Sequence, residues 1–255
     1  MGDADFCRVL PAGLDASRAA NGRVKIMAFP PLGIQTLAPV LRQAGHEVRL
    51  FDTAHPQMKA EDIARAVAQE PPDVIALSFL STTTYPAAKG MARRLKAEAP
   101  QVPIIVGGPF ATLNAVHILR DCPDMDAVGV GEGGTAADYW HTLRIGAVAG
   151  LVWRSHGGVK RTPASLLRDL DRFPIGCASL PISYIESLPL DVPAVLSLDK
   201  FCTVRTSRGC PYACSCCIPA QARAVAEPLV SARTGELQEL HDRGTARSTS
   251  PTTTF

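Results

Sequence analysis

The stretch DVIALSFLSTTTYPAAKGMARRLKAEAPQVPIIVGG, residues 73–108, decides the fold of this chain. Short apolar runs at 73–79 and 102–108 enclose a segment, 85–100, with the composition and apolar spacing of a helix. Runs that are apolar throughout are typical of strands buried on both faces, and a helical crossover makes two such strands parallel. The stretch therefore predicts a strand, a crossover helix and a second, parallel strand.

The same alternation continues on both sides of this unit. It predicts strands at 23–29, 46–52 and 126–134, and helices at 34–45, 59–70, 113–122 and 135–144. We therefore expect an α/β fold, a doubly wound parallel sheet of the Rossmann or flavodoxin type with helices on both faces.

Small residues and hydroxyls gather where these strands end. The five loops are PPLG (30–33), DTAHP (52–56), SFLSTTT (78–84), GGPFAT (107–112) and GEGG (131–134). Ligands of doubly wound sheets bind beyond the carboxyl ends of the strands, where glycine lets the backbone approach closely. Each glycine could instead serve a tight turn, but five such loops on one edge favour a ligand. No GxGxxG follows the first strand, which argues against a dinucleotide.

Composition narrows the class of protein. The 255 residues are 46% hydrophobic and 20% charged with a formal net charge of +2, so we expect no nucleic-acid partner. No apolar run is long enough to span a membrane, and the N-terminus lacks the features of a signal peptide. We expect a cytoplasmic protein, in which thiols stay reduced.

Four of the eight cysteines lie in RTSRGCPYACSCCIPA, residues 205–220. Cys210, Cys214 and Cys217 have the spacing C-x3-C-x2-C, and three thiolates in one short loop suit an iron–sulfur cluster with one iron left for another ligand. Zinc would need a fourth ligand, and Cys202 is eight residues upstream. Zinc and purely structural thiols remain as alternatives.

These motifs resemble two joined protein families. Over residues 24–145, PPLGIQTLAPVLRQAGHEVRLFD, PPDVIALSF, VPIIVGGPFAT and DAVGVGEGG resemble the cobalamin-binding domain that precedes many radical S-adenosylmethionine enzymes. SRGCPYAC and the cysteine spacing resemble the radical S-adenosylmethionine superfamily itself. The resemblance as a whole is to class B-type radical methyltransferases, and it implies three cofactors: cobalamin, S-adenosylmethionine and a [4Fe-4S] cluster.

The resemblance also implies roles for individual residues. The cluster would be held by Cys210, Cys214 and Cys217, and S-adenosylmethionine would lie near Tyr212 and Cys216. The implied cobalamin contacts are Pro31, Gly33, Asp52, Ser78, Leu80, Ser81, Gly107, Gly108, Gly131, Glu132 and Gly133. The nucleotide tail of the corrinoid would reach down near Ser78 and Gly107–Gly108.

The chain departs from the family pattern at three positions. Domains that ligate cobalt carry DxHxxG, whereas His55 stands one position late after Asp52, so we expect no histidine on cobalt. Cys216 replaces a residue that is commonly aromatic, and Gly134 stands where a second acid is frequent.

We expect three parts in the chain. They are a cobalamin-binding domain (1–145), a hairpin with an inter-domain connector (146–196) and the N-terminal part of a radical S-adenosylmethionine barrel (197–255). A helix is predicted at 229–244 and neither strand nor helix at 245–255. The resemblance implies an acidic segment such as FTDDNF on the next strand of the barrel. DNA that encodes FTDDNF, read one base later, can encode SPTTTF, with which this chain ends. We therefore expect a frameshift between about Arg243 and Ser250 and a truncated barrel.

The resemblance implies a methyltransferase that acts on an unreactive carbon or phosphorus centre of a small molecule, in natural-product biosynthesis. An electron donor such as flavodoxin or ferredoxin would reduce the cluster. Alternatives are an oxidative cyclase or rearrangement enzyme with the same cofactors, a non-catalytic cobalamin-binding fragment, and a doubly wound domain that binds another small ligand.

Overall fold

A computed structural model describes residues 8–11, 32–53, 58–131, 148–164, 201–203, 234, 238, 241–242 and 247–249. The chain divides into two compact units, one formed by 1–26 and 40–165 and the other by 27–39 and 166–255. Helix α1 (Leu32–Gln43) crosses the boundary between them. None of the described helices is long and apolar enough to cross a membrane.

The first unit is built on a seven-stranded sheet in the order β2-β1-β3-β4-β5-β6-β7. The parallel strands are β1 (Arg8–Pro11), β2 (Arg49–Leu50), β3 (Ile75–Ser78), β4 (Ile104–Gly107) and β5 (Ala127–Gly129). Strand order reverses at β1, since β2 pairs on one side of it and β3 on the other. The predicted doubly wound parallel sheet is thereby confirmed, and its order is that of the flavodoxin-like class.

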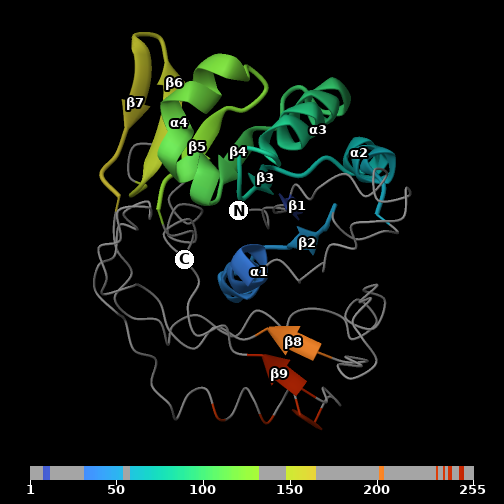
Figure 1. The fold of residues 1–255 in the computed structure, drawn as a ribbon. Coiled ribbons are helices and arrows are strands. Elements are labelled where there is room, and N and C mark those ends of the chain that lie inside the picture. Colours follow the sequence, from blue (N-terminus) through green and yellow to red (C-terminus); the bar gives the residue numbers. More distant parts are fainter. Residues whose placement is uncertain are drawn as a thin grey trace. The chain divides into compact units, whose positions relative to one another are not determined.

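The predicted hairpin forms, and it extends this sheet. Strand β6 (Leu151–Ser155) pairs antiparallel with β5, and β7 (Gly158–Arg161) pairs antiparallel with β6 (Figure 1). Antiparallel strands at the edge of a mostly parallel sheet are common. The sheet is therefore mixed, with a parallel part at β1–β5 and an antiparallel edge.

Strand β1 was not predicted. The first strand was predicted at 23–29, which lies outside the described residues, whereas Arg8–Pro11 occupies the position between β2 and β3. The sequence of β1, RVLP, has only two apolar residues between arginine and proline and so shows no apolar run; pairing with its two neighbours defines the strand.

Three helices line one side of the sheet: α2 (Ala60–Gln69), α3 (Tyr85–Glu98) and α4 (Pro109–Asp121) (Figure 1). The first two agree closely with the predicted ranges. The third begins four residues before the predicted 113, because Gly108 is its N-cap and Pro109 supplies a preset φ at the first helical position. The helix predicted at 135–144 lies outside the described residues.

Alternate residues of the strands supply the main core. One face of the sheet contributes Ile75, Leu77, Ile104, Val106, Val128 and Val152, which pack with buried residues of α2, α3 and α4. A second cluster, with Ala127, Val148 and Leu151, includes the intervening Ile105 and Trp153. The side chains of each strand thus alternate between the two faces of the sheet. Strands β3 and β4 pair in register up to their carboxyl ends.

The second unit contains a two-stranded sheet. Strand β8 (Phe201–Thr203) pairs in parallel with β9 (Arg247–Thr249), and the described residues between them at 234, 238 and 241–242 are helical, as predicted. The prediction that 245–255 contains no strand is wrong. Pairing with β8 creates β9 from a polar segment that has no apolar alternation.

Candidate functional site at the strand ends

The carboxyl ends of β3 and β4 bring together three of the residues singled out in the sequence. Ser78 is the register partner of Gly107, and the amide of Phe79 donates to the carbonyl of Gly107 at 3.3 Å. A Cβ built on Gly108 would lie 3.2 Å from Ser78 Oγ. These residues therefore form one small surface of backbone and a single hydroxyl.

The two glycines of this surface differ in the space around them. Gly108 has a φ of +101°, and a Cβ there would come within 2.4 Å of the carbonyl oxygen of Phe79, closer than any side chain tolerates. Among the described residues, a Cβ on Gly107 would meet nothing nearer than the carbonyl oxygen of Gly129 at 4.0 Å. Gly108 thus allows two strand ends to touch, whereas Gly107 leaves room beside them.

The loop after β3 combines an exposed leucine with a hydroxyl cluster. The side chain of Leu80 is 71% exposed. The amide of Ser81 donates to Thr84 Oγ1 at 3.1 Å, Ser81 Oγ lies 2.7 Å from Thr83 Oγ1, and the hydroxyl of Thr84 donates to the carbonyl of Ser81 at 2.9 Å. These bonds hold the start of α3, so Leu80 is presented from a fixed turn.

Thr112, which was given no role from the sequence, bonds to the end of β5. Gly131 has a φ of +93°, and its amide donates to Thr112 Oγ1 at 3.1 Å. On its other side, the amide of Val130 donates to the carbonyl of Gly150 at 2.6 Å. The only hint in the sequence was that Thr112 closes the GGPFAT loop.

Two further predicted residues lie elsewhere in the described structure. Asp52 follows β2 and is buried, with a polar partner. Gly33 is exposed in the first turn of α1.

The remaining predicted site residues lie outside the described residues. They are Pro31, Glu132, Gly133, Tyr212, Cys216 and the three cysteines Cys210, Cys214 and Cys217, and His55 lies outside as well. Among the residues that the structure does describe, no group of three or more histidine, cysteine or acidic side chains could hold a metal ion.

Aromatic rings support the strand ends from the core side. Phe79 lies 5.7 Å from Tyr85 and 5.9 Å from Phe110 between ring centroids. The phenol of Tyr85 donates to Asp121 at 2.7 Å; burial, then this bond, raises the pKa of Tyr85. The same bond, together with Lys89 at 2.9 Å, lowers the pKa of Asp121.

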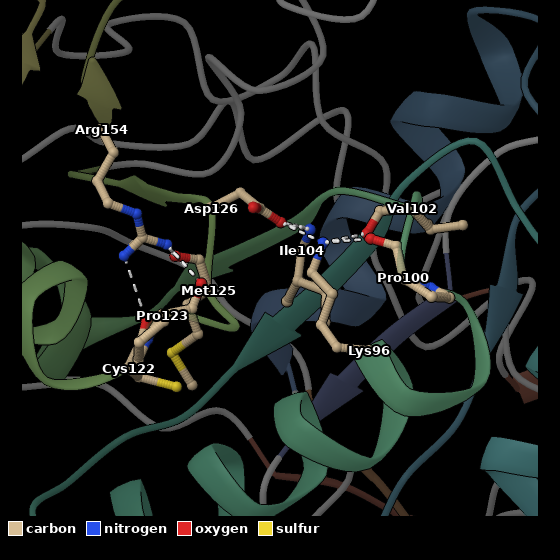
Figure 2. A network of polar contacts seen from close by, with 9 residues as sticks. All are labelled: Lys96, Pro100, Val102, Ile104, Cys122, Pro123, Met125, Asp126 and Arg154. Carbon is tan, nitrogen blue, oxygen red and sulfur yellow. Dashed lines mark hydrogen bonds and ion pairs between the residues drawn. The ribbon is translucent and has the colours of Figure 1, made fainter. Parts of the chain in front are cut away.

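At the opposite ends of the strands, the amino ends of β4 and β5, charged side chains join the strands to neighbouring segments (Figure 2). Arg154 of β6 donates to four carbonyl groups at the end of α4 and the entry to β5, those of Leu119, Cys122, Pro123 and Met125. Lys96 lies 2.9 Å from Asp126 and donates to the carbonyl of Val102, while Asp126 also accepts from the amide of Ile104. Charge is therefore used for stability at the amino ends of β4 and β5.

The residues at the carboxyl ends fit a corrinoid. The open side of Gly107 leaves space for a narrow group, Ser78 offers a hydroxyl next to it, and the exposed Leu80 offers apolar surface to a large ring. A large, mostly apolar ligand with a polar tail needs this combination.

Comparisons with known proteins agree with this geometry. Residues 27–139 match the family model of the B12 binding domain. The chain is 30% identical over 210 residues to the uncharacterized methyltransferase PH0819 of Pyrococcus horikoshii, covering 80% of this chain and 44% of the relative. It is 27% identical over 206 residues to the anaerobic magnesium-protoporphyrin IX monomethyl ester cyclase of Synechocystis, covering 78% and 40%, and 27% identical over 211 residues to the hopanoid C-3 methylase of Methylococcus capsulatus, covering 75% and 36%.

A solved structure shares the fold. The cobalamin-dependent S-adenosylmethionine radical enzyme OxsB, with aqua-cobalamin and S-adenosylmethionine bound, superposes with a TM-score of 0.76 at 17% identity, covering 98% of this chain and 34% of OxsB. The chain thus spans less than half the length of the proteins it matches. Residues 27–139 are thus similar to a B12 binding domain, and the curated relatives of the chain are named as methyltransferases and cyclases.

Proposed function

We propose that the protein is a cobalamin-dependent radical S-adenosylmethionine methyltransferase acting on an unreactive carbon or phosphorus centre of a small molecule. The observation that carries the proposal is that one chain combines a B12 binding domain with the spacing C-x3-C-x2-C in SRGCPYACSCC. A fold shared with OxsB and relatives named as methyltransferases support it.

In this proposal the strand ends of the first unit bind cobalamin. Gly107 admits the nucleotide tail beside Ser78, and Leu80 contacts the ring. The other proposed contacts are Pro31, Gly33, Asp52, Ser81, Gly108, Gly131, Glu132 and Gly133. When bound, cobalamin supplies the methyl group, and the protein's part is to hold it in one orientation and exclude water.

The cysteine loop has the second role. Cys210, Cys214 and Cys217 supply three thiolates to a [4Fe-4S] cluster, and the chemistry of that donor set leaves one iron for S-adenosylmethionine. Tyr212 and Cys216 lie beside that cofactor in the proposal. We further propose that 1–145 binds cobalamin, that 146–196 connects the domains and that 197–255 belongs to the radical domain.

An external donor such as flavodoxin or ferredoxin would reduce the cluster. Thiolate ligands of this kind persist where the compartment is reducing, so we place the protein in the cytoplasm. No partner is proposed among nucleic acids or membranes.

Anaerobic reconstitution tests the proposal. The full chain, loaded with iron, sulfide and hydroxocobalamin, should bind cluster and corrinoid and cleave S-adenosylmethionine to 5′-deoxyadenosine after reduction. Cys214→Ala should lose the cluster and this cleavage, while the matched Cys122→Ala, whose buried thiol is not part of the motif, should keep both. Hydroxocobalamin binding without 5′-deoxyadenosine in the wild type would leave only a non-catalytic cobalamin-binding module.

A cyclase is the second candidate. It is favoured by the relative named as an anaerobic magnesium-protoporphyrin IX monomethyl ester cyclase. Transfer of labelled methyl from S-adenosylmethionine to product would support methyl transfer, and an oxidised or rearranged product without label would support the cyclase.

A further inference from the structure

Three strand ends of the B12 binding domain are held in one frame by the first turns of α4. At its start, Gly108 lies against the residue that follows β3, because a Cβ at this position would come within 2.4 Å of the carbonyl oxygen of Phe79. The helix then runs under the end of β5, where Thr112 meets Gly131. Helix α4 thus touches the ends of β3, β4 and β5 within a single turn.

Thr112 is the link between these ends. Its amide makes the first helical bond, to the carbonyl of Gly108 at 2.9 Å, and its side-chain oxygen accepts from the amide of Gly131 at 3.1 Å. A threonine in a helix often bonds back to the preceding turn. Here the oxygen acts as an acceptor across 19 positions of sequence instead.

The exit of β5 depends on this one side-chain oxygen. Two amides lie at this exit, those of Val130 and Gly131. The amide of Val130 bonds to the backbone carbonyl of Gly150, and a substitution of Thr112 would leave that bond in place. That of Gly131 bonds to the hydroxyl of Thr112, and the φ of +93° at Gly131 turns the chain in a direction that disfavours any other residue. Loss of the oxygen would leave that peptide group without its partner and free to rotate.

We propose that Thr112 is a positioning residue that sets the exit of β5 for a corrinoid lying across the strand ends. The inference rests on the proposed binding of cobalamin, and it adds a residue that acts through Gly131 rather than by touching the cofactor. Thr112→Val preserves the shape of the side chain and removes the acceptor, while Thr112→Ser preserves the acceptor.

Amide hydrogen exchange of the full chain tests the bond without any cofactor. The Gly131 amide should exchange about tenfold faster in Thr112→Val than in wild type and stay near wild type in Thr112→Ser. Unchanged exchange in Thr112→Val would overturn the inference even if cobalamin binds well.

Hydroxocobalamin titration, followed by visible absorption, tests the consequence. Thr112→Val should bind about tenfold more weakly, and Thr112→Ser within about twofold of wild type. Arg154→Met is the matched control, because it loosens the other end of α4, far along the helix from Thr112. It should melt earlier while keeping wild-type affinity.

Each other outcome decides against a specific claim. Weak binding by both Thr112→Val and Arg154→Met would show that general stability, not positioning, governs affinity. An unfolded Thr112→Val protein would also overturn the inference, because one bond at a strand end should not decide folding. A wild-type protein that binds no hydroxocobalamin would overturn the proposed function itself, whereas normal binding by every variant would overturn only the role of Thr112.

Discussion

Replacing Gly108 by alanine should strongly destabilise the B12 binding domain. The added Cβ would lie 2.4 Å from the carbonyl oxygen of Phe79 and 3.2 Å from its amide nitrogen. Both are backbone atoms of the residue that directly follows β3, and its amide is bonded to Gly107, so they cannot move without disturbing the end of that strand. The φ of +101° at this position is in addition one that L-residues rarely adopt.

Two costs add to give the magnitude. A non-glycine residue in such a backbone conformation costs about 1–3 kcal/mol. Forcing an atom into a closed contact costs about 1–3 kcal/mol more. A loss of about 3–4 kcal/mol corresponds to a fall in melting temperature of roughly 10–15 °C for a domain of this size.

Thermal and urea unfolding would measure this loss, with two other glycines as matched controls. Gly107→Ala places its Cβ 4.0 Å from the nearest atom of the described residues, so the free energy of unfolding should change by less than about 0.5 kcal/mol. Gly90→Ala, in an exposed turn of α3 with nothing within 4 Å, should stabilise by about 0.5–1 kcal/mol.

An unchanged melting temperature would refute this reasoning. If Gly108→Ala melted like the wild type, the close approach of Gly108 to the backbone of Phe79 would be wrong. For the site, Gly107→Ala should bind hydroxocobalamin at least about tenfold more weakly, because its methyl group occupies the space given to the nucleotide tail.

Four other changes have defined outcomes. Arg154→Met should lower the free energy of unfolding by about 2 kcal/mol, because four carbonyl groups around the end of α4 lose a charged donor; equal stability in urea titrations would contradict this. Since the pKa of Tyr85 is raised by burial and by its bond to Asp121, the phenol stabilises fully below its unfolded pKa of about 10, and that contribution is lost as pH rises above it. A pH series of urea unfolding should therefore show an alkaline decline that Tyr85→Phe reduces, and identical declines would argue against the raised pKa. The pKa of Asp121 is lowered by the bond from Tyr85 and by Lys89, so Asp121→Asn should reduce the stability lost as pH falls below about 4. Leu80→Ser should leave stability within about 0.5 kcal/mol of wild type, because the side chain is exposed, yet weaken hydroxocobalamin binding; unchanged affinity would remove Leu80 from the proposed site.

The central elements of the fold could be predicted because their signals are local. The unit β3–α3–β4 matches its predicted ranges closely, since buried strands need continuous apolar runs and α3 needs apolar residues at helical spacing. Strands β1 and β9 could not be predicted in this way. Both are defined by partners distant in sequence, β1 by β2 and β3, and β9 by β8.

The same distinction applies to the candidate site. Ser78 and Gly107 could be expected together, because parallel strands that end in register bring their last residues to one edge. The bond from Gly131 to Thr112 depends on the rotation of α4 relative to β5, which no local pattern reveals. The early start of α4 was within reach, since a proline directly after glycine is typical of a first helical position.

The two ends of the strands differ in role: contacts at the amino ends stabilise the fold, and the carboxyl ends carry the proposed binding surface. At the amino ends of β4 and β5, Lys96, Asp126 and Arg154 join strands and helices by charged hydrogen bonds, which a ligand there would have to break. At the carboxyl ends, Gly108 packs backbone against backbone and the Thr112 hydroxyl accepts from the Gly131 amide, so neither of these contacts uses a charged group. A large cofactor can therefore settle on the carboxyl edge without competing with the bonds that keep the domain folded, so substitutions at Gly107 should change affinity while those at Arg154 change stability.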